Sequence, residues 1–120
     1  MTRDLKPREK VLAASFVGLG LLHFVRPAAF DQIVPPSTPL TPRQATALSG
    51  VAEIAGGIGL LLPATRPAAR WGLLALLLAV YPANIYMAQY PEKFGVPRWV
   101  TWARLPLQPL LMWAVYRAGR

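Results

Sequence analysis

Five residues whose types could do chemistry lie inside long apolar stretches of this chain: His23, Glu53, Asn84, Arg104 and Gln108. Placing a charged side chain at the middle of a membrane helix costs about 2.5 to 3.5 kcal/mol on insertion scales, so Glu53 and Arg104 should face each other, water or a ligand. Arg104 and Gln108 are four residues apart, which places two donors on one helix face. We therefore predict that the five residues form a ligand-binding or intramembrane polar cluster, within which the sequence assigns no catalytic residue.

Metal and thiol chemistry are not indicated by the residue types. The chain has one histidine and no cysteine. We predict no metal site, because no carboxylate other than Glu53 is near His23 in any expected helix. Without cysteine the chain can form no disulfide, thiol nucleophile or Cys-ligated iron-sulfur cluster.

The overall composition indicates a membrane protein. Hydrophobic residues make up 54% of the 120 residues and charged residues only 15%, well below the roughly 25% charge of soluble domains. The formal net charge is +8, but the Lys and Arg residues lie almost entirely between the apolar stretches. That distribution favours contact with anionic headgroups and argues against nucleic acid binding.

Four apolar segments are the candidate membrane spans, at about 9–25, 45–62, 71–90 and 99–116. A bilayer core of about 30 Å needs about 20 residues at about 1.5 Å per helical residue. The proline-rich segment 26–44 is expected to be an outer loop, and the remaining connections are short, which makes neighbouring helices antiparallel. The sequence therefore predicts a single domain over 1–120, an all-α, integral membrane, four-helix up-and-down bundle.

The basic residues predict the orientation of this bundle. Eight lie on one side of the expected spans and four on the other, with Arg104 inside a span; the first group is Arg3, Lys6, Arg8, Lys10, Arg66, Arg70, Arg117 and Arg120, and the second is Arg26, Arg43, Lys93 and Arg98. The side richer in Lys and Arg is usually cytoplasmic. We expect a multi-pass protein of the inner (plasma) membrane with both termini inside.

With that orientation, all five candidate residues fall in the outer half of the bilayer, in a slab on the order of 10 Å deep. Three prolines, Pro82, Pro106 and Pro109, interrupt the same region and free backbone carbonyls. A purely structural interpretation stays open. In it, Glu53 and Arg104 only neutralise each other, and Asn84 and Gln108 join helices for about 0.6 kcal/mol each.

Short motifs that contain these residues run through nearly the whole chain: His23-Phe24 with Pro27 and Phe30, Ile33-Val34-Pro35-Pro36, Ser49-Gly50 with Glu53 and Gly56-Gly57-Ile58-Gly59-Leu60-Leu61, Pro82-Ala83-Asn84 with Met87-Ala88, and Arg104-Leu105-Pro106-Leu107-Gln108 with Trp113. Together they resemble the DoxX-like family of small bacterial membrane proteins. The resemblance implies a four-helix membrane fold and an association with quinone-linked, sulfur-redox or oxidative-stress systems. Since this chain has no cysteine, the electron-carrying group would come from a partner or a bound quinone.

We expect a non-catalytic membrane subunit or scaffold, whose polar outer-half pocket binds a small amphipathic ligand such as a quinone in a redox or stress-response assembly. Two alternatives stay open: a small-molecule or proton-coupled carrier in which Glu53 takes a proton, and a membrane oxidoreductase that uses Glu53 or His23 for proton transfer. The expected partners are the lipid bilayer, a membrane or redox protein, and a second copy of the chain. The residues by themselves specify no cofactor.

Overall fold

The computed structural model describes residues 4–95 and 97–119, and these residues form helices joined by short connections. The prediction of an all-helical protein is confirmed, because the described residues contain no strand. Each of the four predicted spans overlaps one long helix. The elements are α1 (Pro7–Val25), α2 (Pro27–Asp31), α3 (Pro42–Leu61), α4 (Arg66–Gln89), the 3-10 helix η1 (Pro91–Phe94) and α5 (Arg98–Ala118).

All four long helices begin earlier than predicted, and in α1, α3 and α4 the reason is a proline in the first turn. A proline there loses nothing, since the first N–H groups of a helix have no partner within the helix. Thr41 caps α3 with its hydroxyl, which accepts from Gln44 N at 3.2 Å, while the Gln44 side chain accepts from Thr41 N at 3.1 Å. The prediction that 26–44 is entirely a loop was therefore wrong, since the segment contains α2 and the start of α3.

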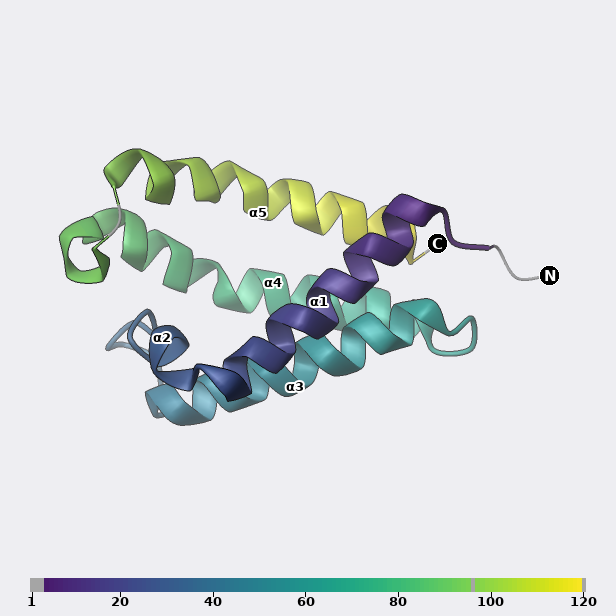
Figure 1. Cartoon of the computed structure of the whole chain (residues 1–120), viewed down its shortest axis with the longest axis horizontal. Helices are drawn as coiled ribbons and strands as arrows, with labels where there is room; N and C mark the ends of the chain where they lie inside the picture. Colours follow the sequence, from purple (N-terminus) through teal and green to yellow (C-terminus); the bar gives the residue numbers. More distant parts are fainter. Residues whose placement is uncertain (1–3, 96, 120) are drawn as a thin grey trace.

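The long helices are arranged as two antiparallel pairs. Figure 1 shows α1 lying along α3 and α4 lying along α5, with α3 and α4 in contact near the turn that joins them. The two pairs diverge toward the end that carries α2 and η1. The buried core consists of Ala13, Phe16, Leu60, Ala69, Leu73, Leu77 and Val115.

Glycines bring α1 and α3 into close contact. A Cβ atom at Gly57 would lie 2.6 Å from the Ala13 carbonyl oxygen, and one at Gly20 would lie 2.7 Å from the Gly50 carbonyl oxygen. Real Cβ atoms do not approach other heavy atoms this closely. Small residues at these positions therefore let the two backbones pack together, as membrane helices commonly do.

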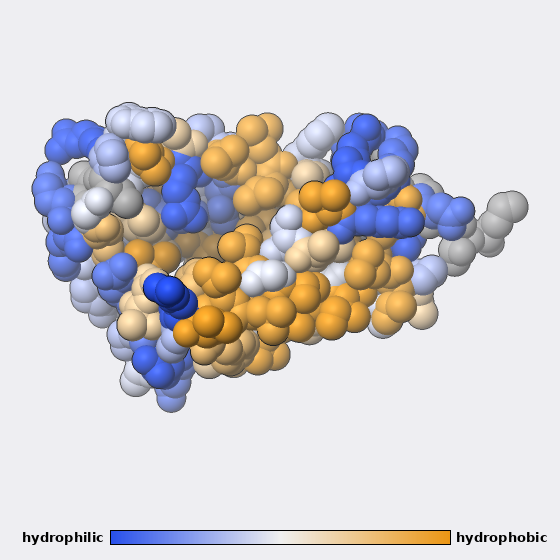
Figure 2. All heavy atoms as spheres, viewed as in Figure 1, coloured by the Kyte–Doolittle hydropathy of each residue, from blue (hydrophilic) through white to orange (hydrophobic). Residues whose placement is uncertain are grey.

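The surface is rich in large apolar side chains. Figure 2 shows hydrophobic residues across the middle of the viewed face and hydrophilic residues gathered at both ends. Two helices, α3 and α4, are long and apolar enough to cross a membrane by length and composition. Only 28% of the apolar window of each is buried inside the protein, whereas the core helix of a soluble protein would be mostly buried.

The described N-terminal residues and the end of α5 lie at the same end of the molecule (Figure 1). The basic residues therefore divide between the two ends as the sequence predicts, except that Arg3 and Arg120 lie outside the described residues. At the end with the termini, the Arg70 guanidinium carbon lies 3.8 Å from the centroid of the Tyr116 ring. This stacking places an arginine and an aromatic ring together where a membrane helix would meet water.

Candidate functional site

A buried histidine and a glutamate form the most distinctive polar contact between α1 and α3. His23 Nε2 lies 3.1 Å from Glu53 Oε2, and both side chains are largely buried. The other ring nitrogen, Nδ1, lies 2.7 Å from the Leu19 carbonyl oxygen. Since a carbonyl oxygen only accepts, Nδ1 must carry a hydrogen. The contact between Nε2 and Oε2 is then attractive only if a single proton lies between them, on the imidazole or on the carboxyl group.

Glu53 Oε2 accepts no hydrogen bond in the structure. Although His23 is within 3.1 Å of this oxygen, no well-aligned hydrogen bond reaches it, and the atom is buried. Distance alone does not make a hydrogen bond, because the bond weakens steeply when the donor points away. Glu53 Oε2 can therefore still accept a hydrogen bond from a third polar group.

Helix α2 covers the histidine side of this pair. The Phe30 ring stacks on the His23 ring, with centroids 3.8 Å apart and planes inclined by 19°. Sequence reasoning included Phe30 only within the family motif, and no periodicity indicated the stacking, because α2 was expected to be loop. The candidate site therefore includes an aromatic cover that the sequence analysis missed.

Helix α2 is held in place by its last residue, Asp31. One carboxylate oxygen accepts from the Thr46 hydroxyl at 2.6 Å, and the other accepts from Arg43 Nε at 2.9 Å. The Thr46 hydrogen bond, helped by Arg43, lowers the pKa of Asp31 below the ordinary value of 3.8, while partial desolvation acts in the opposite direction. Asp31 is therefore ionised near neutral pH and ties the cover to α3.

The second polar group joins α4 to α5. Asn84 Nδ2 donates to Gln108 Oε1 at 3.0 Å, and Gln108 Nε2 donates to the Leu77 carbonyl oxygen at 2.7 Å. The Tyr81 hydroxyl donates to the Leu105 carbonyl oxygen at 3.1 Å. Pro109 lacks the N–H that would normally bond to that carbonyl. The carbonyl oxygen that Pro109 leaves without a backbone partner therefore accepts a hydrogen bond from a side chain of the neighbouring helix α4.

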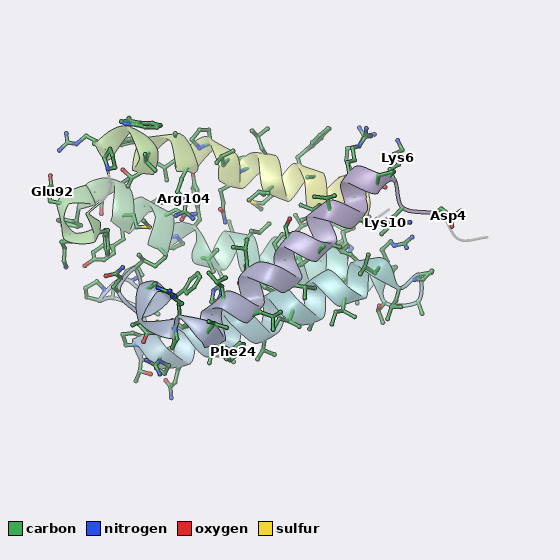
Figure 3. All side chains as sticks on the ribbon, viewed as in Figure 1. Asp4, Lys6, Lys10, Phe24, Glu92 and Arg104 are labelled. Atoms are coloured by element: carbon green, nitrogen blue, oxygen red, sulfur yellow. The ribbon has the colours of Figure 1, made fainter. Side chains whose placement is uncertain are left out.

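Arg104 does not pair with Glu53, so that part of the structural interpretation was wrong. Its Nη1 lies 3.8 Å from Met87 Sδ, and Figure 3 shows the side chain between α5 and α4. No carboxylate lies within 4.0 Å of Arg104 among the residues that the structure describes. The reason is the order of packing: α5 lies against α4, which separates Arg104 from the α1–α3 pair.

The five predicted residues thus form two groups, and no described contact joins the groups. The groups also differ in level along the bundle. Gly56 faces Leu73 across the antiparallel α3–α4 contact, which places Glu53 level with about Leu76, eight residues or about 12 Å from Asn84. The predicted cluster therefore consists of His23 with Glu53 on one helix pair, and Asn84 with Gln108 and the nearby Arg104 on the other.

Comparison with known proteins gives one match. A family model described as a domain of unknown function, DUF8561, matches residues 12–118, which include all five candidate residues and Phe30. No curated protein and no solved structure matches the chain. The resemblance to DoxX-like proteins stays a prediction.

Proposed function

We propose that this chain, which belongs to the DUF8561 family, is a four-helix, multi-pass membrane protein whose His23–Glu53 pair binds the polar end of a small amphipathic molecule such as a quinone. In this proposal the protein is a non-catalytic subunit of a redox or stress-response assembly, as its resemblance to DoxX-like proteins implies. The membrane is the inner membrane, with both termini in the cytoplasm.

Support for membrane insertion extends beyond α3 and α4. Helices α1 and α5 have 19 and 21 residues, and at about 1.5 Å per residue both lengths are close to the bilayer core of about 30 Å. Large side chains on both are exposed, such as Val11 on α1 and Trp113 on α5. A water-soluble protein rarely exposes contiguous apolar surface on this scale.

The observation that carries the binding proposal is the buried 3.1 Å contact between His23 Nε2 and Glu53 Oε2, in which Oε2 receives no aligned hydrogen bond. A proton on His23 Nε2 or on the Glu53 carboxyl group can be donated to a ligand oxygen in place of the contact within the pair. A quinone carbonyl is such an acceptor, and its isoprenoid tail would lie along the apolar helices. A buried, partly unsatisfied polar pair gains more from a ligand hydrogen bond than an exposed pair does, because no water competes.

We favour binding over turnover because the described surroundings of the pair supply no second reacting group. The nearest groups named by the contacts are the Leu19 carbonyl and the Phe30 ring. Neither is a nucleophile or an acid. The pair therefore orients a ligand and holds a proton, and a partner would perform any electron transfer.

The proposal is tested by measuring quinone binding to protein purified in a mild detergent. Wild-type protein should retain or rebind an isoprenoid quinone, detected by mass spectrometry of the extracted lipids. Glu53→Gln should weaken binding about tenfold, as loss of one well-placed hydrogen bond to a charged group does. The matched control is Glu92→Gln, because Glu92 is an exposed carboxylate in η1, beyond the end of α4. Equal binding by both variants, or no quinone binding by wild type, would contradict the proposal.

A proton-coupled carrier is the second candidate, and the same buried pair of titratable side chains supports it. In a carrier the proton would leave the pair when helices rearrange, and the three prolines in α4 and α5 mark where such movement is easiest. Proton-driven uptake into proteoliposomes that is abolished by Glu53→Gln, but not by Glu92→Gln, would favour the carrier over the subunit.

A further inference from the structure

A cavity lies at the spread end of the bundle, apart from the His23–Glu53 pair. Its volume is about 580 Å³, and it opens between the proline turn after α2 and the last turns of α4. Pro35, Pro36 and Ile85 contribute apolar wall, while Tyr86, Tyr90 and Lys93 contribute polar groups. This size suits part of a small ligand or a lipid headgroup.

Lys93 brings a positive charge to this cavity that no carboxylate offsets. Its Nζ donates to the Tyr86 hydroxyl at 2.7 Å. Nζ lies 5.2 Å from the centroid of the Tyr86 ring. This distance follows from the hydrogen bond, because the hydroxyl group is attached to that ring. The neighbouring carboxylate, Glu92, instead contacts Arg98 at 3.7 Å. Among the described residues, no acidic group lies within 4.0 Å of Lys93.

The donors at this position can hold an anion. An ammonium group has three hydrogens, and the bond to Tyr86 uses one of them. The Tyr86 hydroxyl accepts from Lys93 and keeps its own hydrogen for a second acceptor. Lys93 and Tyr86 together therefore offer several donors to the oxygens of one phosphate group.

An apolar path leads from the cavity along α4. Pro82 and Ile85 line the cavity, and Leu78, four residues before Pro82, lies on the same helix face. Leu78 is 64% exposed and Ile85 is 39% exposed. A ligand whose anionic group reached Lys93 could lay a hydrocarbon chain along this stripe.

We propose that the cavity binds an anionic phospholipid, with its phosphate at Lys93 and Tyr86 and an acyl chain along Leu78, Pro82 and Ile85. The apolar stripe is what distinguishes a lipid from a free phosphate ester. This site needs the membrane location of the proposed function but not its quinone site. Binding of phospholipid and of quinone can therefore fail separately.

The test is native mass spectrometry of the intact detergent-purified chain with phosphatidylglycerol or phosphatidylcholine. Wild type should retain phosphatidylglycerol in preference, and Lys93→Gln should lower its apparent affinity about fivefold, the usual effect of one basic residue near anionic lipid. Lys6→Gln at the opposite end is the matched control and should lower phosphatidylglycerol binding much less than Lys93→Gln does. Glu53→Gln should also leave phospholipid binding unchanged, which separates this site from the quinone site.

Two results would overturn the proposal. The first is equal phosphatidylglycerol binding by the Lys93→Gln and Lys6→Gln variants. The second is displacement of the lipid by an equal concentration of glycerol phosphate, since this would show that the headgroup alone suffices and that the site serves a soluble phosphate ester. Persistent binding of the lipid in excess glycerol phosphate would support the contribution of the acyl chain.

Discussion

His23 Nε2 lies 3.1 Å from Glu53 Oε2, while the other nitrogen of the His23 ring donates to the Leu19 carbonyl. The histidine is thereby fixed in one orientation, with Nε2 aimed at α3. The two residues stand thirty positions apart in the sequence, on helices whose backbones meet through glycines. The pair is therefore a buried polar link between α1 and α3.

Removing one member of the pair should cost more than removing both. His23→Leu leaves the Glu53 carboxyl buried without a partner, and losses of about 3 to 5 kcal/mol are typical when one half of a buried pair is deleted. The His23→Leu/Glu53→Leu double variant should recover much of that loss, since no polar group then remains. Thermal unfolding in detergent measures all three proteins. Additive losses would show that the residues do not act as a pair.

Phe30→Ala should loosen the cover over His23. The ring is stacked on the imidazole, and such aromatic contacts contribute about 0.5 to 1.5 kcal/mol beyond their buried area. Hydrogen exchange of the amides in 27–34 should accelerate severalfold. Phe24→Ala is the control, because the Phe24 side chain is half exposed and lies outside α2. Equal exchange in both variants would mean that Phe30 does not hold α2.

Attachment of α2 to α3 should weaken in acid. The pKa of Asp31 is lowered in the folded protein by the Thr46 hydroxyl and Arg43. A carboxyl group with a lowered pKa stabilises the fold at pH values above its ordinary pKa of 3.8, and the contribution disappears as the pH falls through the lowered value. Hydrogen exchange across α2 should therefore rise below about pH 4 in wild type.

Two variants separate this effect from general acid unfolding. Asp31→Asn should show fast exchange in α2 at neutral pH and little further change in acid, because it has no charge to lose. Asp4→Asn should behave as wild type, since Asp4 is exposed at the opposite end. An unchanged pH profile in Asp31→Asn would contradict the assignment.

The Tyr81 hydroxyl should stabilise the fold, because it supplies a hydrogen bond that Pro109 on α5 cannot make. Tyr81→Phe leaves the partly buried Leu105 carbonyl without the donor that replaces the missing N–H of Pro109, and the loss should be about 1 kcal/mol, the low end of the range for an unmet acceptor. Pro109→Ala restores a backbone N–H at the correct position. Tyr81→Phe should thus destabilise less in the Pro109→Ala background than in wild type, as measured by thermal unfolding. Equal losses in both backgrounds would rule out this compensation.

The glycines of α3 and α4 should respond differently to the same substitution. Gly57→Ala inserts a Cβ 2.6 Å from the Ala13 carbonyl oxygen, and overpacking of this kind costs about 1 to 3 kcal/mol. Gly72→Ala meets no atom within 4 Å and should be neutral or stabilising, because alanine favours helix by about 1 kcal/mol. Thermal unfolding of the two variants gives the comparison. Similar stabilities would mean that α1 and α3 are not in close contact at Gly57.

Much of the fold could be predicted from the sequence because helix formation is local. The four apolar segments are long and lack alternation, so each forms a helix whatever its neighbours are. Helix starts were less predictable, since proline ends one helix and begins another equally well. Pro42 was assigned to a loop although Thr41 and Gln44 carry the signature of a helix cap.

The sequence by itself determined which residues would need partners, because a polar group in an apolar helix is costly wherever that helix packs. It identified His23, Glu53, Asn84, Arg104 and Gln108. Only the tertiary structure decided the pairing. Because α1 packs on α3 and α4 packs on α5, Glu53 contacts His23 and Arg104 lies beside Met87. Helix rotation and neighbour order depend on glycine contacts between segments far apart in the chain, and one sequence does not record them.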